Sequence, residues 1–200
     1  MATYTNIAAT TAAVTNRFVA SANMKVGTYT VANASPVWQG GCLVTVTHTE
    51  VGGGVDTLGT IVVAGTDPSG QTIYDTITPL NGTVATGVKV FRTVTSVTGV
   101  GWVIGVGNDT IVVGCAAGSI VANGSGQLFA VVVNTTAAAT VVVSDARGTI
   151  ATLKSSIAEG NFLFGVDGVT FAGYLKVATT STNDITVIHS ASQPQIYATA

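Results

Sequence analysis

Short segments rich in Thr and Val, separated by turn signals, constrain the fold of this 200-residue chain more than any other feature. The two residue types supply roughly a third of the sequence, and their β-branched side chains lose little conformational freedom on a pleated sheet. The segments recur at intervals of about ten residues, as the strands of a sandwich or barrel do. The sequence therefore predicts an all-β protein.

The clearest strand signals lie in the first half of the chain. Residues 43–50 alternate strictly, with two valines and His48 on one face and threonines on the other. Residues 60–65 and 71–78 are expected to form a hairpin around Asp67-Pro68-Ser69-Gly70, whose residue types are typical of a tight turn. These patterns favour antiparallel pairing of neighbouring strands.

The remaining segments follow the same pattern. Further strands are predicted over residues 89–97, 102–106, 110–113, 128–134, 140–144, 169–179 and 184–190. Of these, 102–106 is expected to pair with 110–113 across a turn at Gly107-Asn108-Asp109, and Ser155–Glu159 is expected to form one helical turn. Runs of three valines in 128–134 and 140–144 indicate strands covered on both faces.

Composition shifts along the chain suggest a division into two domains. Residues 1–24 are rich in Ala and Thr without a sustained period, and we expect them to form an N-terminal arm. A small, glycine-rich stretch from Cys115 to Gln127 is expected to connect the domains. The prediction is two small antiparallel β-sandwich or barrel domains, residues 25–115 and 116–200, preceded by the arm.

Low charge limits the classes of partner. Only 8% of residues are charged, the net charge is −2 and the mean hydropathy is +0.55. Such a surface is built from Thr, Ser, Asn, Gly and apolar groups, so we expect a homo-oligomer or a larger assembly. The basic residues are scattered singly, which argues against direct contact with nucleic acid. They are Arg17, Lys25, Lys89, Arg92, Arg147, Lys154 and Lys176.

The sequence shows no membrane-spanning pattern and no secretory leader. The most apolar stretch, residues 100–122, is interrupted by a polar turn and several glycines. The first residues lack a basic region followed by an apolar one, so we expect synthesis in a cytoplasm. In that reducing compartment Cys42 and Cys115 are expected as two small buried apolar side chains, with a disulfide between them as the alternative.

No combination of residues indicates catalysis, a cofactor or a metal. His48 and Glu50, two apart on one strand, have a spacing that metal sites use, but no third ligand is near, and His189 is expected as a partly exposed imidazole. Most aspartates fall at turns, and Asp67, Asn108 and Asp109 match no calcium-loop pattern. Asp75, on a strand, is the one aspartate considered as a catalytic acid, and it is expected to face solvent. We therefore predict no enzyme activity.

The aromatic residues offer one further kind of site. Trp38 precedes a predicted strand and Trp102 begins one, and each is expected to anchor a hydrophobic core. The alternative is a stacking platform for a glycan, for which Trp38, Trp102 and Tyr174 are the candidates.

Several strings of residues resemble a known class of protein. GTDPSGQTIYDTI, KVFRTVTSVT and GNDTIVVG in residues 59–114 resemble β-rich virion proteins of tailed bacteriophages, most of all head decoration, or cement, proteins. FAVVVNTTAAATVVVSDARGTIATL and GVTFAGYLKVATTSTNDITVIHSA resemble modules of the same proteins. The resemblance covers about two-thirds of the chain and rests on hairpin patterns that carry no chemistry.

The resemblance implies a function as well as a fold. It implies a non-enzymatic protein on the capsid exterior that binds the major capsid protein, bridges capsomers and forms a homo-oligomer, usually a trimer. Related modules also occur in tail tubes, tail decoration and head fibres, so these remain alternatives. A glycan-binding adhesin module is a third hypothesis, from another class.

Overall fold

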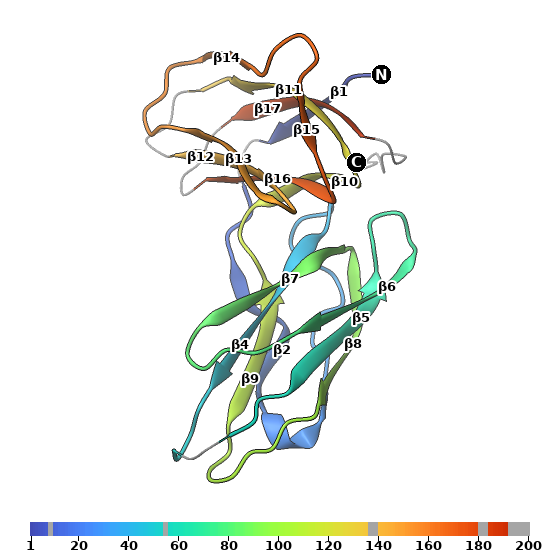
Figure 1. Cartoon of the computed structure of the whole chain (residues 1–200), viewed down its shortest axis with the longest axis vertical. Helices are drawn as coiled ribbons and strands as arrows, with labels where there is room; N and C mark the ends of the chain where they lie inside the picture. Colours follow the sequence, from blue (N-terminus) through green and yellow to red (C-terminus); the bar gives the residue numbers. More distant parts are fainter. Residues whose placement is uncertain (8–9, 54–55, 136–139, 180–183, 192–200) are drawn as a thin grey trace. The chain divides into compact units, whose positions relative to one another are not determined.

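The computed structural model describes residues 1–7, 10–53, 56–135, 140–179 and 184–191 (Figure 1). It is all-β, as the sequence predicts, and the helical structure in these ranges is one 3-10 turn, η1, at Met24–Val26. The chain divides into two compact units. Ala13–Ala116 form the first, here called the inserted unit, and Met1–Ala12 with Ala117–Ala200 form the second, here called the terminal unit.

The inserted unit holds two four-stranded antiparallel sheets. Its strands are β2 (Val14–Asn23), β3 (Thr28–Tyr29), β4 (Cys42–Thr49), β5 (Thr60–Thr66), β6 (Thr72–Ile77), β7 (Val84–Phe91), β8 (Thr93–Val100) and β9 (Thr110–Cys115). One sheet has the order β2-β9-β4-β7 and the other the order β3-β8-β5-β6. The predicted hairpin is confirmed, because β5 pairs with β6 from Ile61–Ile77 to Thr66–Thr72.

The inner faces of these two sheets form one hydrophobic core. Val44 and Val46 of β4 are fully buried, as are Ile61 and Val63 of β5 in the opposite sheet. The residues of each pair are two positions apart, so they lie on the same face of their strand, and that face points into the core. The inserted unit is thus a β-sandwich.

The terminal unit is a second sandwich with its own core. Its strands are β1 (Thr3–Ile7), β10 (Ser119–Asn123), β11 (Gly126–Val133), β12 (Val141–Asp145), β13 (Gly148–Leu153), β14 (Gly160–Leu163), β15 (Val169–Phe171), β16 (Tyr174–Thr179) and β17 (Ile185–Ala191). One sheet has the order β1-β17-β11-β14, with β15 also paired to β11, and the other the order β10-β16-β12-β13. The middle residue of each valine run, Val132 or Val142, is half-buried, while both flanking valines are buried.

The N-terminal segment differs from the expected arm. Residues 3–7 form β1, which pairs with β17 from Thr3–His189 to Ile7–Ile185, so the first and last strands of the described chain lie side by side (Figure 1). Residues 14–23 form β2 at the edge of the inserted unit, where Phe18 and Val19 are buried. β2 lacks a regular alternation of apolar and polar residues, because its pairing with β9 shifts register twice and so breaks the period of two.

The expected connection also differs. Residues 119–123, inside the stretch from Cys115 to Gln127, form β10, and Ile120 and Ala122 are buried in the terminal unit. The chain passes from the inserted unit to the terminal unit at Ala116–Ala117, next to the boundary expected at residue 115. The glycines here permit close backbone approach, since a Cβ on Gly126 would overlap the backbone of Ser190.

Three predicted elements are wrong in detail. The strand expected over 89–97 is broken at Arg92, where the chain leaves β7 in one sheet and enters β8 in the other. Residues 102–106 form no strand, because Gly101 and Gly107 adopt positive φ angles of 69° and 83°, which end extended structure on both sides. The strand β9, which was expected to pair with 102–106, pairs with β2 and β4 instead. Ser155–Glu159 contains turns instead of a helical turn.

Across the described residues, no helix is long and apolar enough to span a membrane.

Candidate functional site

A buried histidine–aspartate pair lies at one end of the inserted unit. His48 is 1% exposed near the end of β4, and Asp109, just before β9, is fully buried. His48 Nε2 lies 2.7 Å from Asp109 Oδ2, and the Val51 amide donates to Asp109 Oδ1 at 2.9 Å. Burial alone would raise the pKa of Asp109, but the hydrogen bonds from Val51 and His48 outweigh it and hold the pKa below its usual value.

The loops beside this pair are fixed by further polar contacts. Gly105 N–H donates to Asp56 Oδ1 at 2.7 Å, and the ammonium group of Lys25 donates to the Gly107 carbonyl at 2.6 Å. His48 Nδ1 and Asp56 Oδ2 are buried without a hydrogen-bond partner within the described ranges. These hydrogen bonds therefore hold the neighbouring loops in place, and His48 is too deeply buried to contact a substrate.

Glu50, which lies two residues from His48 in the sequence, does not contact it in the structure. Glu50 lies beyond the end of β4 and is exposed, and its Oε2 accepts a hydrogen bond from Asn81 Nδ2 at 2.5 Å. The actual partner, Asp109, is 61 residues from His48 in sequence, so no local spacing could reveal it. Among the described residues, no group of three or more His, Cys, Asp or Glu side chains is arranged to hold a metal ion.

Asp75 joins the two sheets of the inserted unit. It was expected to face solvent, but it is only 6% exposed, because β6 and β7 are the neighbouring edge strands of the two sheets and Asp75 points between them. Its Oδ2 accepts from the amides of Val88 at 2.8 Å and Lys89 at 3.1 Å. A Cβ on Gly87 would overlap this oxygen, so the carboxylate occupies space that only glycine leaves free.

Asp145 plays a comparable part in the terminal unit. Its carboxylate is buried at the turn between β12 and β13 and accepts from the Arg147 guanidinium at 2.7 Å and from the Ala172 amide at 2.9 Å. Burial would raise the pKa of Asp145, but these hydrogen bonds outweigh it and lower the pKa. Asp67, in contrast, accepts hydrogen bonds within its own exposed turn, from Ser69 and Gln71.

His189 is buried, whereas the sequence favoured a partly exposed ring. It is fully buried on β17, its Nε2 lies 3.1 Å from Thr5 Oγ1 on β1, and the edge of Phe171 packs nearby with ring centroids 6.4 Å apart. Burial among uncharged groups lowers the pKa of His189. The pairing of β1 with β17, which sequence reasoning did not find, produces this environment.

The low pKa of His189 predicts a loss of stability in mild acid. The unfolded chain binds a proton near pH 6.5 and the folded chain only at lower pH, so stability is constant above that value and declines below it. We therefore expect the terminal unit to lose stability progressively as the pH falls from 7 to 5. Urea unfolding followed by far-UV circular dichroism measures it.

The matched variant is His189→Gln, which cannot titrate. Its unfolding free energy is expected to lose less with falling pH than that of the wild type, whatever its value at pH 7. Tryptophan fluorescence serves as an internal control, because Trp38 and Trp102 are the only tryptophans and both lie in the inserted unit. An unchanged pH slope in His189→Gln would contradict the prediction.

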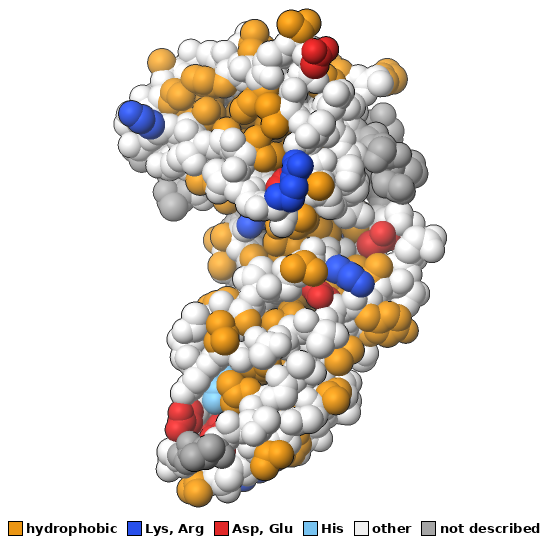
Figure 2. Space-filling view, in the orientation of Figure 1, with side chains coloured by type: hydrophobic (Ala, Val, Ile, Leu, Met, Phe, Trp, Pro, Cys, Tyr) orange, Lys and Arg blue, Asp and Glu red, His pale blue; other side chains and the backbone are white. Residues whose placement is uncertain are grey.

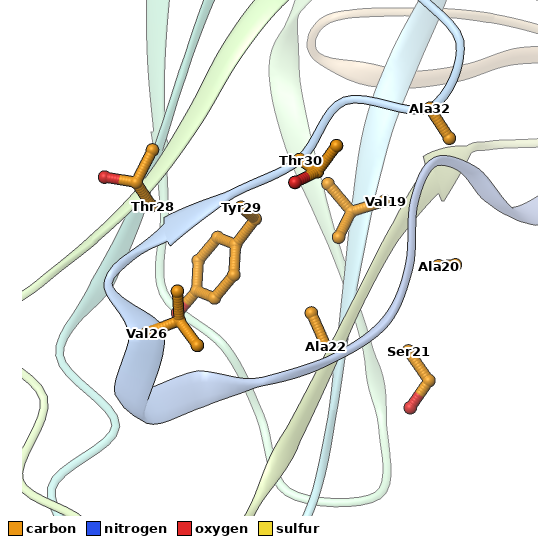
Figure 3. A pocket seen from close by; sticks show the side chains of 9 residues that line it. All are labelled: Val19, Ala20, Ser21, Ala22, Val26, Thr28, Tyr29, Thr30 and Ala32. Carbon is orange, nitrogen blue, oxygen red and sulfur yellow. The ribbon is translucent and has the colours of Figure 1, made fainter.

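An apolar groove of about 340 Å³ opens in the inserted unit between β2 and β3, which are edge strands of the two sheets (Figure 3). The ring of Tyr29 lies among the labelled side chains, with Val26 beside it and Val19 and Ala22 across from it. Tyr29 is its one titratable residue; the hydroxyl donates to the Met24 carbonyl at 2.9 Å, and burial raises its pKa. The groove can seat a small apolar group, but it holds no acid or base for catalysis.

Apolar side chains are exposed on both units, while charged groups are sparse (Figure 2). In the inserted unit these are Val26, Val37, Val51, Tyr74, Leu80, Val84, Val88, Val100, Val103 and Val106. In the terminal unit they are Met1, Tyr4, Leu163, Val166 and Val169. Three of the nine acidic residues, Asp75, Asp109 and Asp145, are buried, which lowers the surface charge further than composition alone indicates.

The candidate aromatic platforms are partly covered. Trp102 packs against the core of the inserted unit, and Trp38 and Tyr174 are half-buried. None of the three therefore presents a fully open ring face.

The chemistry found on the described residues is structural: carboxylates brace backbone amides, and the exposed surface is apolar and hydroxylic. No protein-family model, curated protein or solved structure compared with the chain matches it.

Proposed function

We propose that this chain is a non-enzymatic structural protein of a tailed-phage virion, which decorates the capsid exterior and stabilises it by bridging capsomers. In this proposal it binds the major capsid protein as a homo-oligomer, with a trimer favoured. It is made in the host cytoplasm and makes no direct contact with nucleic acid or membrane.

The observation that carries the proposal is the exposed apolar surface on two all-β units. Val88, Leu163 and Val166 are 69%, 75% and 99% exposed, in a chain with 8% charged residues. Solubility normally rests on a surface of which about a quarter to a third is charged. A charge-poor surface with projecting apolar groups suits burial against neighbouring subunits. The hairpin strings that resemble cement proteins support the same reading.

The mechanism follows from linkage. A protein that binds the assembled lattice, and not its separate subunits, shifts the equilibrium toward the lattice by mass action. A contact of standard size buries about 1,600 Å² in total, and repetition over many copies multiplies its effect on the shell. No group on the protein needs to react, which fits carboxylates committed to internal hydrogen bonds.

Copy number in the virion tests the proposal. Quantitative mass spectrometry of purified particles is expected to give a ratio to the major capsid protein near one, or a simple fraction of one, because a cement protein occupies equivalent lattice positions. A few copies per particle, or none, would contradict it. The tail-tube alternative predicts rings or polymers of the isolated protein, whereas the cement proposal predicts a closed oligomer that is a small multiple of 20.0 kDa.

A further inference from the structure

Two cysteine side chains meet inside the inserted unit. Cys42 is the first residue of β4 and Cys115 the last of β9, and these are the two central strands of one sheet. Val44 is the registered partner of Cys115, so Cys42 lies two residues further along the same face of β4. Both thiols are buried, and their Sγ atoms lie 2.6 Å apart.

The surroundings make the two thiols unequal. Cys42 donates a hydrogen bond to Cys115, which lowers the pKa of Cys115, and the Val37 amide and the positive charge of Arg17 act in the same direction. The same hydrogen bond and burial raise the pKa of Cys42. Cys115 is therefore the better thiolate, and Cys42 lies in place to react with whatever attaches to it.

From this geometry we infer that Cys42 and Cys115 form one intramolecular disulfide when the protein meets a disulfide oxidant. Because Cys115 is buried in the folded sheet, it reacts when folding or local opening exposes it: its thiolate attacks one sulfur of a small disulfide such as oxidised glutathione and releases one thiol. Cys42 then attacks the mixed disulfide and releases the second thiol. The two cysteines lose two electrons and two protons, and the oxidant gains both. The inference does not depend on the proposed function.

The bond would link strands that are neighbours in the sheet but distant in sequence. The residues are 73 positions apart, so the bridge closes a long loop and restricts the unfolded chain strongly. The folded sheet already holds the sulfurs together. We therefore expect oxidation to raise the melting temperature of the inserted unit by about 10 °C.

The test compares thiol content with stability in one preparation. Protein purified under reductant is equilibrated with oxidised glutathione, both folded and during refolding from urea. Intact mass is expected to fall by two hydrogen atoms, no thiol should react with a maleimide in denaturant, and the fluorescence-detected melting temperature should rise. The control is Cys115→Ala, which cannot close the bridge and should show no rise on oxidation.

Several outcomes would overturn the inference. Two free thiols after refolding in oxidised glutathione would show that the strands hold the sulfurs apart. A stable glutathione adduct would show that Cys42 does not resolve the mixed disulfide. A disulfide-linked dimer on a non-reducing gel would assign the cysteines to an intermolecular bond instead.

Discussion

Replacing Asp75 with alanine is expected to lower the free energy of unfolding of the inserted unit by about 3 kcal/mol. The Asp75 carboxylate is the acceptor for two amides of β7, those of Val88 and Lys89. These amides lie where the β4–β7 ladder shifts register, so they depend on a side chain from the other sheet. Alanine would leave both without that acceptor.

Gly87 supplies a sharper form of the same test. A Cβ at this position would overlap Asp75 Oδ2 and contact Ile77, so Gly87→Ala is expected to displace the carboxylate and cost a similar amount. Once Asp75 has been truncated, most of that overlap is gone. The double variant Asp75→Ala/Gly87→Ala should therefore be much less destabilised than the sum of the two single changes.

Urea unfolding followed by tryptophan fluorescence measures all three variants, because both tryptophans lie in the inserted unit. The matched control is Asp67→Ala in the same β5–β6 hairpin, where the carboxylate accepts hydrogen bonds only within an exposed turn. It should cost about 1 kcal/mol or less. Equal losses for Asp75→Ala and Asp67→Ala, or simple additivity with Gly87→Ala, would show that Asp75 does not join the sheets.

The sequence predicts those parts of the fold that local patterns determine. The alternation over 43–50 identifies β4, and the turn residues from Asp67 to Gly70 identify the hairpin of β5 and β6. Both signals are complete within a few residues, since the period of two and the turn chemistry are properties of the local backbone.

Local sequence patterns do not predict which distant strands pair with each other. β1 pairs with β17, and Thr5 and His189, which lie in contact, are 184 residues apart in the sequence. No residue pattern near Thr5 indicates which strand it pairs with. The chain therefore leaves the terminal unit after β1, builds the inserted unit and returns, whereas composition predicts an arm followed by two consecutive domains. The strand β2 could not be recognised from the sequence, because its register shifts make the order of buried and exposed residues irregular.

The same limit applies to the polar groups. Sequence reasoning identifies His48 and Asp75 as residues of interest from their places on strands, but their partners are Asp109 and the backbone of β7. A buried acid and a solvent-facing acid on an edge strand look alike in sequence. One signal was available, because a glycine inside a strand, such as Gly87 in β7, often marks the close approach of another group.

Truncation of Asp109 is expected to be more costly than truncation of Asp75. Asp109→Ala removes the partner of a buried histidine whose other nitrogen, Nδ1, already has no hydrogen-bond partner in the described structure. It also leaves the Val51 amide without its acceptor. Breaking a buried pair in this way costs about 4 kcal/mol, because one polar group stays buried and unpaired.

Glu50→Gln is the control, since Glu50 is the acid that spacing in sequence pairs with His48. It is exposed and contacts Asn81, so its change should stay within about 0.5 kcal/mol. If Glu50→Gln destabilised the inserted unit as much as Asp109→Ala, the pairing found here would be wrong.

Acid titration separates the charge of Asp109 from its packing. Because the pKa of Asp109 is lowered on folding, its carboxylate contributes stability that is complete above the unfolded value, about 3.9, and is lost as pH falls through the folded value. Asp109→Asn keeps the shape of the side chain but cannot titrate, so below about pH 4 its stability should decline less steeply than that of the wild type. Parallel curves would mean that the carboxylate gains nothing from its partners on folding, and that His48 and Val51 hold the loop by shape alone.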